Sequence, residues 1–324
     1  MPIEILVVGG AGYIGSHMVE TLRQANILSV VLDNLSTGHA SSVLDAKLIV
    51  GDIADSALLN SLFKSHDFSA VIHFASFIQV GESVKDPAKY YTNNVSGTLN
   101  LLNAMRRAKV NKFIFSSTAA VYGSPLYTPI DEKHPLAPIN PYGHGKRMIE
   151  QILEDYGRAY GLQYGILRYF NAAGASPGGK LFEKHEPETH LIPLVLQAAR
   201  DPQKTITIFG RDYPTPDGTC VRDYIHVSDL CEAHLLALQA LDEGKPHCTY
   251  NLGTGQGHSV QQVIEIAREV TKRPIQVLEG NRRDGDPAIL IADARMAMRE
   301  LNWQPKYPQL RSMIEHAMKF KKWL

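Results

Sequence analysis

Short apolar runs alternate with stretches of helical periodicity along the first half of this chain. Residues 3–8 form a β-branched apolar run that ends at Gly9, and residues 13–23 then place apolar side chains at helical spacing. The sequence predicts further strands, separated by helical stretches, at residues 29–32, 47–50, 70–74, 112–116 and 164–167. Nearly continuous apolar strands are buried on both faces, which is typical of a parallel sheet covered by helices.

The alternation weakens in the second half of the chain. From about residue 171 to residue 221 it gives way to loops rich in proline and glycine, and after about residue 251 strands and helices are mixed again. We therefore expect an α/β protein in which a doubly wound parallel sheet is joined to a second, smaller α/β domain. The predicted boundaries are residues 1–173 plus about 222–252 for the sheet domain, and about 174–221 plus 253–324 for the smaller domain.

The charge balance limits the classes of partner. Lys and Arg together number 33, and so do Asp and Glu, which makes the formal net charge zero. A balanced chain has no basic field that attracts nucleic acid or an anionic lipid surface. We expect neither nucleic acid nor a membrane as a partner.

Two further features favour a cytoplasmic protein. The chain has no run of about 18 apolar residues, the length that spans a bilayer, and no basic segment typical of a signal peptide. Cys220, Cys231 and Cys248 are the only cysteines, and their spacings match no disulfide framework or metal site. We interpret them as packing residues of a protein in a reducing compartment.

A glycine-rich segment joins the first predicted strand to the first predicted helix. Gly10, Gly12 and Gly15 fit the GxGxxG pattern, and Gly9, Gly12 and Gly15 fit its GxxGxxG variant. Such glycines permit a tight turn and a close backbone approach to a pyrophosphate, while the helix N-terminus offers free N–H groups to the anion. Strand, glycine loop and helix in this order indicate a Rossmann-type dinucleotide-binding domain.

An acidic residue supports this interpretation and selects the cofactor. Asp33 ends the second predicted strand, 21 residues after Gly12. A carboxylate at this position hydrogen-bonds the ribose hydroxyls of the adenosine and repels the 2′-phosphate of NADP. We therefore predict NAD as the cofactor.

Side chains suited to acid–base chemistry follow the fifth predicted strand. Thr118 lies just after that strand, and Tyr142 and Lys146 then begin an amphipathic helix. Residues four apart share one face of a helix, so we expect the ammonium of Lys146 near the phenol of Tyr142. A lysine and an oxidised nicotinamide about 5 Å away would each lower the pKa of the phenol by roughly two units before desolvation is counted. We predict Tyr142 as the acid–base group and Thr118 as a hydrogen-bond partner of the reacting oxygen.

Several segments along the chain match a known family. They are residues 9–17 (GGAGYIGSH), 33–34, 51–52, 73–75, 81–83, 93–95, 121–123, 167–171, 217–218, 221–227 (VRDYIHV) and 282–286 (RRDGD). With them the chain resembles the extended short-chain dehydrogenase/reductase family, and within it the epimerases that act at C4 of UDP-glucose and UDP-galactose. The resemblance implies an NAD-binding domain, a UDP-sugar-binding smaller domain, and reversible oxidation at C4 through a 4-keto sugar. It also implies a homodimer that assembles through helices near residues 87–108 and 141–160.

The resemblance and the glycine loop together assign two sets of residues. The expected cofactor contacts are Gly9, Gly12, Tyr13, Ile14, Gly15, Asp33, Asn34, Asp52, Ile53, Phe74, Ala75, Asn93, Thr118, Tyr142, Lys146 and Phe170. The expected substrate contacts are Thr118, Tyr142, Asn171, His190, Leu191, Arg222, Arg283, Asp286 and Leu290. Arg222 and Arg283 are expected to hold the diphosphate, because planar guanidinium groups suit its oxygens.

Leu290 carries a narrower expectation about the substrate. The resemblance puts a gatekeeper beside the C2 substituent of the sugar at this position, where Tyr fills the space that an N-acetyl group needs. The smaller Leu290 therefore predicts that the N-acetylhexosamine pair is also accepted. A core leucine within the apolar run 289–291 is the alternative that the sequence leaves open.

Other functions are weighed against this one. A 4,6-dehydratase of the same family needs a further acid and base, and residues 116–122 contain no carboxylate. An epimerase of another UDP-sugar, such as a UDP-uronate, and a non-catalytic NAD-sensing scaffold are the remaining alternatives. Residues 183–190 gather Glu and His side chains, but they lack the HExxH spacing and are interrupted by Pro187, so we expect no metal. His73 is expected to be a packed histidine rather than a base.

Overall fold

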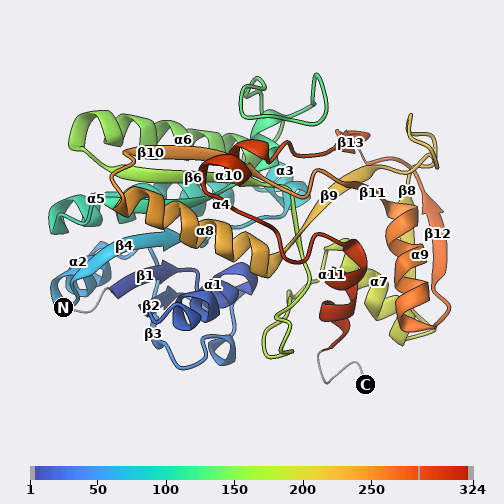
Figure 1. Ribbon diagram of the computed structural model, residues 1–324, viewed down its shortest axis with the longest axis horizontal. Coiled ribbons are helices and arrows are strands. Elements are labelled where there is room, and N and C mark those ends of the chain that lie inside the picture. The colour runs from blue at the N-terminus through green and yellow to red at the C-terminus, as the bar shows by residue number, and fades with distance from the viewer. Residues whose placement is uncertain (1–3, 284, 320–324) are drawn as a thin grey trace.

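The computed structural model describes residues 4–283 and 285–319, and its larger part is a seven-stranded parallel sheet (Figure 1). The strands are β1 (Glu4–Val8), β2 (Leu28–Asp33), β3 (Lys47–Val50), β4 (Phe68–His73), β5 (Lys112–Thr118), β6 (Gln163–Tyr169) and β10 (His247–Leu252). Across the sheet they follow the order β10-β6-β5-β4-β1-β2-β3. The order reverses between β1 and β4, so the sheet is doubly wound, and such sheets bind ligands at the carboxyl ends of these strands. Every strand predicted here is present, although Ile3 lies outside the described residues.

The sheet is covered by helices on both faces. Ile5 and Val7 of β1 lie in one apolar core, and Leu6 and Val8 lie in another. Helices α1 (Tyr13–Gln24), α8 (Val227–Asp242) and α10 (Arg295–Glu300) close the first core, and α2 (Ser56–Ser65), α5 (Thr98–Ala108) and α6 (Pro141–Tyr160) close the second. Shorter elements connect them: η1 (Ala40–Ser42), α3 (Val80–Lys85), α4 (Pro87–Tyr90), η2 (Tyr91–Gly97) and η3 (Ala119–Tyr122). Alternate strand residues point to opposite faces, which explains why these strands carry apolar residues on both faces.

The smaller part lies beyond the carboxyl ends of the strands (Figure 1). Strands β7 (Asn171–Ala173), β11 (Gly257–Ser259) and β13 (Ile289–Leu290) all pair with β9 (Val221–His226), and β8 (Thr205–Phe209) pairs with β12 (Gln276–Gly280). Helices α7 (Leu191–Arg200), α9 (Val260–Thr271) and α11 (Leu310–Met318) share one apolar core with these strands.

The chain passes between the two parts more than once. After β9 it returns to the large sheet with α8 and β10. Helix α10 and Trp303, which the predicted boundaries assign to the smaller domain, also pack in the core of the large sheet. The predicted division into two domains therefore stays a prediction. Residues 1–3 and 320–324, at the ends of the predicted domains, lie outside the described residues.

Two expectations from composition can be compared with the structure. Within residues 4–283 and 285–319, no helix is both long enough and apolar enough to cross a bilayer. Cys220, Cys231 and Cys248 are free and buried, and Cys231 and Cys248 pack in the apolar core of the large sheet as predicted, whereas Cys220 lines a cavity in the smaller part.

Candidate active site

The glycine loop has the shape that a pyrophosphate needs. Gly9 has a φ of +80°, and a Cβ there would lie 2.5 Å from the backbone nitrogen of Ala75. A Cβ on Gly15 would overlap the carbonyl oxygen of Gly9, so this glycine lets α1 pack against the loop. Gly12, the N-cap of α1, makes no side-chain capping bond, and a Cβ there would meet only the oxygen of Gly9, at 3.4 Å. The N–H groups at the start of α1 therefore face space that an anion can occupy.

Asp33 lies beside this loop at the end of β2. Its Oδ2 accepts a hydrogen bond from the backbone N–H of Ala11 at 2.9 Å, and its Oδ1 accepts one from Leu35 at 2.8 Å. A carboxylate has about four acceptor positions, so these bonds orient Asp33 and leave capacity for ribose hydroxyls. The neighbouring Asn34 donates to Asp52 Oδ2 at 2.8 Å. The residues present therefore fit NAD.

The other predicted cofactor residues lie along the same edge of the sheet. The amides of Phe74 and Ala75 donate to the oxygen of Val8 at 2.7 and 3.1 Å, which joins the ends of β1 and β4. Tyr13 and Ile14 form the first turn of α1, Ile53 is buried, Asn93 bonds Asn94, and Phe170 packs beside η3.

Tyr142, Lys146 and Thr118 converge where β5 ends and α6 begins. Asn140 caps α6 by accepting from the N–H of Gly143 at 2.9 Å, which starts the helix just before Tyr142. Thr118 Oγ1 accepts from the N–H of Ala120 at 3.1 Å and hydrogen-bonds Tyr142. Lys146 Nζ lies 5.9 Å from the centroid of the Tyr142 ring. The shared helix face predicted from sequence is therefore confirmed.

Burial has a stronger effect on this group than the sequence suggested. It raises the pKa of Tyr142 to about 12, although the hydrogen bond from Thr118 opposes the rise. Burial also lowers the pKa of Lys146 to about 7, against the opposing charge of Glu150. Lys146 Nζ donates to Ser76 Oγ and to the oxygen of Ser116, both at 2.8 Å, rather than to the phenol. The protein alone thus favours the neutral phenol, and the expectation that Lys146 lowers its pKa is wrong for the protein by itself.

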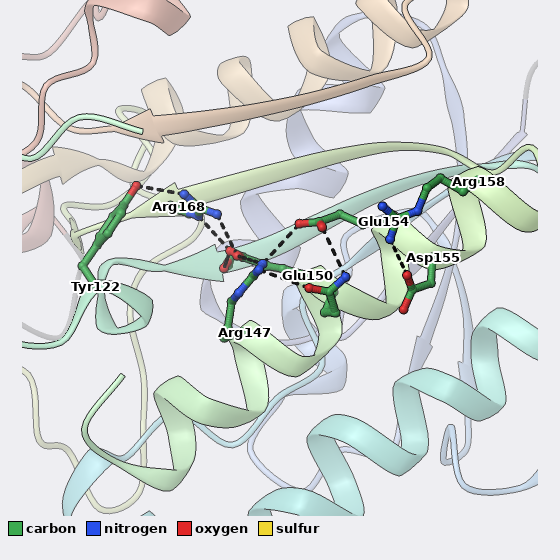
Figure 2. Close-up of polar contacts among 9 residues, drawn as sticks. Tyr122, Arg147, Glu150, Glu154, Asp155, Arg158 and Arg168 are labelled. Carbon is green, nitrogen blue, oxygen red and sulfur yellow. Dashed lines mark hydrogen bonds and ion pairs between the residues drawn. The ribbon is translucent and has the colours of Figure 1, made fainter. Parts of the chain in front are cut away.

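A buried ion pair joins Glu150 of α6 to Arg168 of β6 (Figure 2). Glu150, one turn after Lys146, is completely buried and accepts from Arg168 Nε at 2.9 Å and Nη2 at 2.8 Å. Ser117 Oγ donates to the same carboxylate at 2.6 Å, and Arg147 approaches it at 3.4 Å. The network ties α6 to β5 and β6 just behind Thr118. Our sequence reasoning missed Glu150, although it continues the four-residue spacing of Tyr142 and Lys146.

Six of the nine predicted substrate residues line a cavity of about 500 Å³ in the smaller part. Those that line it are Asn171, His190, Leu191, Arg222, Arg283 and Asp286. Thr118, Tyr142 and Leu290 are not among the described residues that line it. Leu290 instead packs against a small apolar cluster of Ala119, Val121, Tyr122 and Ile130, which Phe170 also contacts.

The two arginines of the cavity are held differently. Arg222 forms an ion pair with Asp286 and donates to the oxygen of Val221 at 2.8 Å. The guanidinium of Arg283 lies 4.1 Å from the centroid of the Phe209 ring. Phe209 also lines the cavity, and the sequence alone had not singled it out. Two arginines and an aromatic ring that line one cavity suit a nucleoside diphosphate.

His190 forms ion pairs with two carboxylates, those of Glu183 and Glu188. Its Nδ1 lies 2.9 Å from carboxylate oxygens of both Glu183 and Glu188. Burial lowers the pKa of His190, but the two carboxylates outweigh burial and raise it to about 10. The predicted substrate contact of His190 is therefore left to its other ring nitrogen.

Known proteins share both the sequence and the fold. The chain matches the NAD dependent epimerase/dehydratase family over residues 5–253. It is 52% identical to the UDP-glucose 4-epimerase of Halalkalibacterium halodurans over 320 residues, which are 99% of this chain and 96% of the relative. The UDP-glucose 4-epimerase of Brucella ovis in complex with NAD is similar at a TM-score of 0.95 and 48% identity, over 97% of each chain. The UDP-Glc/GlcNAc 4-epimerase of Campylobacter jejuni is similar at a TM-score of 0.86 and 42% identity, over 99% of each chain. This chain therefore belongs to the NAD dependent epimerase/dehydratase family.

Proposed function

We propose that this protein interconverts UDP-glucose and UDP-galactose by reversible oxidation at C4 through a 4-keto sugar. The observation that carries the proposal is the meeting of three features at one edge of the sheet. These are the glycine loop with Asp33, the Tyr142–Thr118 hydrogen bond, and the adjacent cavity with two arginines. The similarity to UDP-glucose 4-epimerases over almost the whole chain supports the same reaction.

Each side chain has a defined task in this reaction. Bound NAD supplies the hydride acceptor and donor for C4, and its oxidised nicotinamide adds a positive charge. Tyr142 reacts as the phenolate, which that positive charge favours, so that its oxygen takes the proton of the C4 hydroxyl and later returns it. The Thr118 hydroxyl orients the reacting oxygen, while Ser76 and Ser116 hold Lys146 beside the phenol.

Binding has to be tight at the nucleotide and loose at the sugar. The hexose must present both of its faces to the same reacting groups, so contacts that hold one face would block the reaction. Arg222 and Arg283 supply charge for the diphosphate, and Phe209 offers a flat surface for the base. We infer that these residues hold UDP while the hexose turns.

The first prediction concerns the cofactor, which the proposed reaction returns to its oxidised form in each cycle. Incubation with UDP-galactose and without added NAD should yield UDP-glucose, because the oxidised cofactor is restored when the hydride returns. Chromatography of the sugar nucleotides and NADH absorbance measure the two quantities in one sample. NAD should also appear in the supernatant of the denatured protein, at nearly one equivalent. Steady accumulation of NADH would instead identify a dehydrogenase. UDP-glucuronate serves as the control substrate, because it tests the alternative that the protein is an epimerase of a UDP-uronate.

Leu290 allows a prediction about substrate breadth. It packs against a small apolar cluster that includes residues of η3, the element that Thr118 caps. We propose that it borders the C2 substituent of the sugar and leaves room for an N-acetyl group. UDP-N-acetylglucosamine and its C4 epimer should then interconvert, and Leu290→Tyr should lower kcat/KM for this pair at least about tenfold more than for the unsubstituted pair.

Leu290→Met is the matched control, because it keeps the volume and the apolar character. Coupled assays with both substrate pairs measure the ratio. An equal loss of both activities would mean that Leu290 is a core residue, and full retention of the acetylated activity would remove it from the sugar site.

We also propose a homodimer. Leu99 of α5 and Met148 and Tyr160 of α6 are large, exposed apolar side chains on the two helices that the family resemblance assigns to dimerisation. The molar mass in solution tests this proposal. The cytoplasmic location stays a prediction from sequence.

A further inference from the structure

Four side chains of the loop before α7 meet outside the acid–base group. They are Glu183, His185, Glu188 and His190, and their ligand atoms all lie within 4.8 Å of one another. The Glu183 and Glu188 side chains are only 7% exposed. The spacing along the chain is irregular, but the loop folds back so that residues two to five apart face one centre. Our expectation of no metal had rested on the absence of a helical spacing, and a loop does not need that spacing.

The distances within this cluster suit a shared cation. His190 Nδ1 lies 2.9 Å from Glu183 Oε1 and 2.9 Å from Glu188 Oε1. His185 Nδ1 lies 3.4 Å from Glu183 Oε1 and 3.7 Å from Glu188 Oε2. Ligands bound to one zinc ion at about 2.0 to 2.2 Å are separated from one another by distances of this order.

One atom of the cluster has ion-pair partners but no hydrogen bond. His185 Nδ1 is buried and makes no hydrogen bond, although it is directed at two carboxylates. Buried polar atoms are nearly always satisfied, and an exception calls for a specific cause such as a bound ion. A neutral imidazole nitrogen presents a lone pair, and a cation between it and the carboxylates would satisfy that lone pair.

We propose that Glu183, His185, Glu188 and His190 bind one zinc ion. Imidazole nitrogens and carboxylate oxygens are both zinc ligands, and two of each complete a four-coordinate set. The charges also balance when a zinc ion replaces the extra protons of the two histidines, since two carboxylates neutralise a divalent cation. This site goes beyond the proposed reaction and does not depend on it.

The position of the cluster gives such an ion a structural role. Glu183, Glu188 and His190 also line the substrate cavity, and His190 is the N-cap of α7. The His185 ring meets the Tyr13 ring edge to face, with centroids 6.4 Å apart, which links the cluster to the first turn of α1. A zinc ion would thus join the wall of the substrate cavity to the helix that begins at the glycine loop.

Metal analysis of the full-length protein, purified without chelators and with its NAD retained, tests the proposal. About one zinc ion per chain is expected, and chelator treatment followed by Zn²⁺ should lower and then restore the thermal midpoint. Co²⁺ added in place of zinc should produce the visible absorption of a four-coordinate site. These three measurements on the parent protein do not depend on whether a variant folds.

Two variants and their controls locate the ion. His185→Gln and Glu183→Gln should weaken Zn²⁺ binding, measured against a chromophoric chelator, by at least about 100-fold, the upper end of the loss when outer-shell partners are removed. Glu186→Gln, in the same loop but with a side chain that is 80% exposed, and His247→Gln, at an exposed histidine, should bind as the parent does. The proposal is overturned if the parent binds no zinc, in which case two protonated histidines balance the carboxylates, or if His185→Gln binds it equally well.

Discussion

Replacing Tyr142 by Phe should lower kcat of the epimerisation by about 10² to 10⁴, the range typical of a lost acid–base group. The change removes only the phenol oxygen, which is the atom that hydrogen-bonds Thr118. NAD and UDP should remain bound, because their predicted contacts lie in the glycine loop and the arginine cavity. Initial rates with UDP-galactose give kcat, and titration calorimetry with UDP gives the affinity.

Tyr160→Phe is the matched control for this experiment. Tyr160 ends the same helix, its side chain is exposed, and the same single oxygen is removed. Its kcat should stay within a factor of two of the parent, as expected for a surface change remote from the site. If Tyr142→Phe kept kcat within tenfold of the parent, Tyr142 would not be the acid–base group.

Replacing Arg168 by Met should destabilise the fold by about 3 kcal/mol, because it leaves the buried carboxylate of Glu150 without its bidentate partner. Both side chains are at most 5% exposed. The value is at the lower end of the range for broken buried pairs, since Arg147 still approaches Glu150 at 3.4 Å. Urea denaturation followed by circular dichroism measures the change in the free energy of unfolding.

Arg158→Met provides the comparison from the same helix. Arg158 pairs with Asp155 on the surface, where both side chains are more than half exposed (Figure 2). Such pairs contribute about 0–1 kcal/mol, so this variant should be nearly as stable as the parent. Arg168→Met combined with Glu150→Leu should recover part of the loss, because no buried charge is then left unpaired. Equal stability of the two single arginine variants would contradict the assignment of a buried ion pair.

The parts of the site that the sequence predicted depend on local patterns. Gly9, Gly12, Gly15 and Asp33 lie where one strand, one turn and the next strand place them, so spacing along the chain was sufficient. The shared face of Tyr142 and Lys146 follows from helical geometry alone. Residue-by-residue resemblance then identified six side chains that the folded chain brings to one cavity.

The sequence by itself thus determined the doubly wound sheet, the glycine loop and the shared helix face of Tyr142 and Lys146, because local periodicity and turn chemistry encode them. Only the tertiary structure decided that burial raises the pKa of Tyr142, that Glu150 pairs with Arg168 between two strands and a helix, and that α10 joins the core of the large sheet. It also decided that the loop from Glu183 to His190 closes on one centre. These features arise from contacts between segments far apart in sequence, or from a loop whose residues follow no regular spacing. No local sequence pattern specifies how deeply these side chains are buried or which partners they meet.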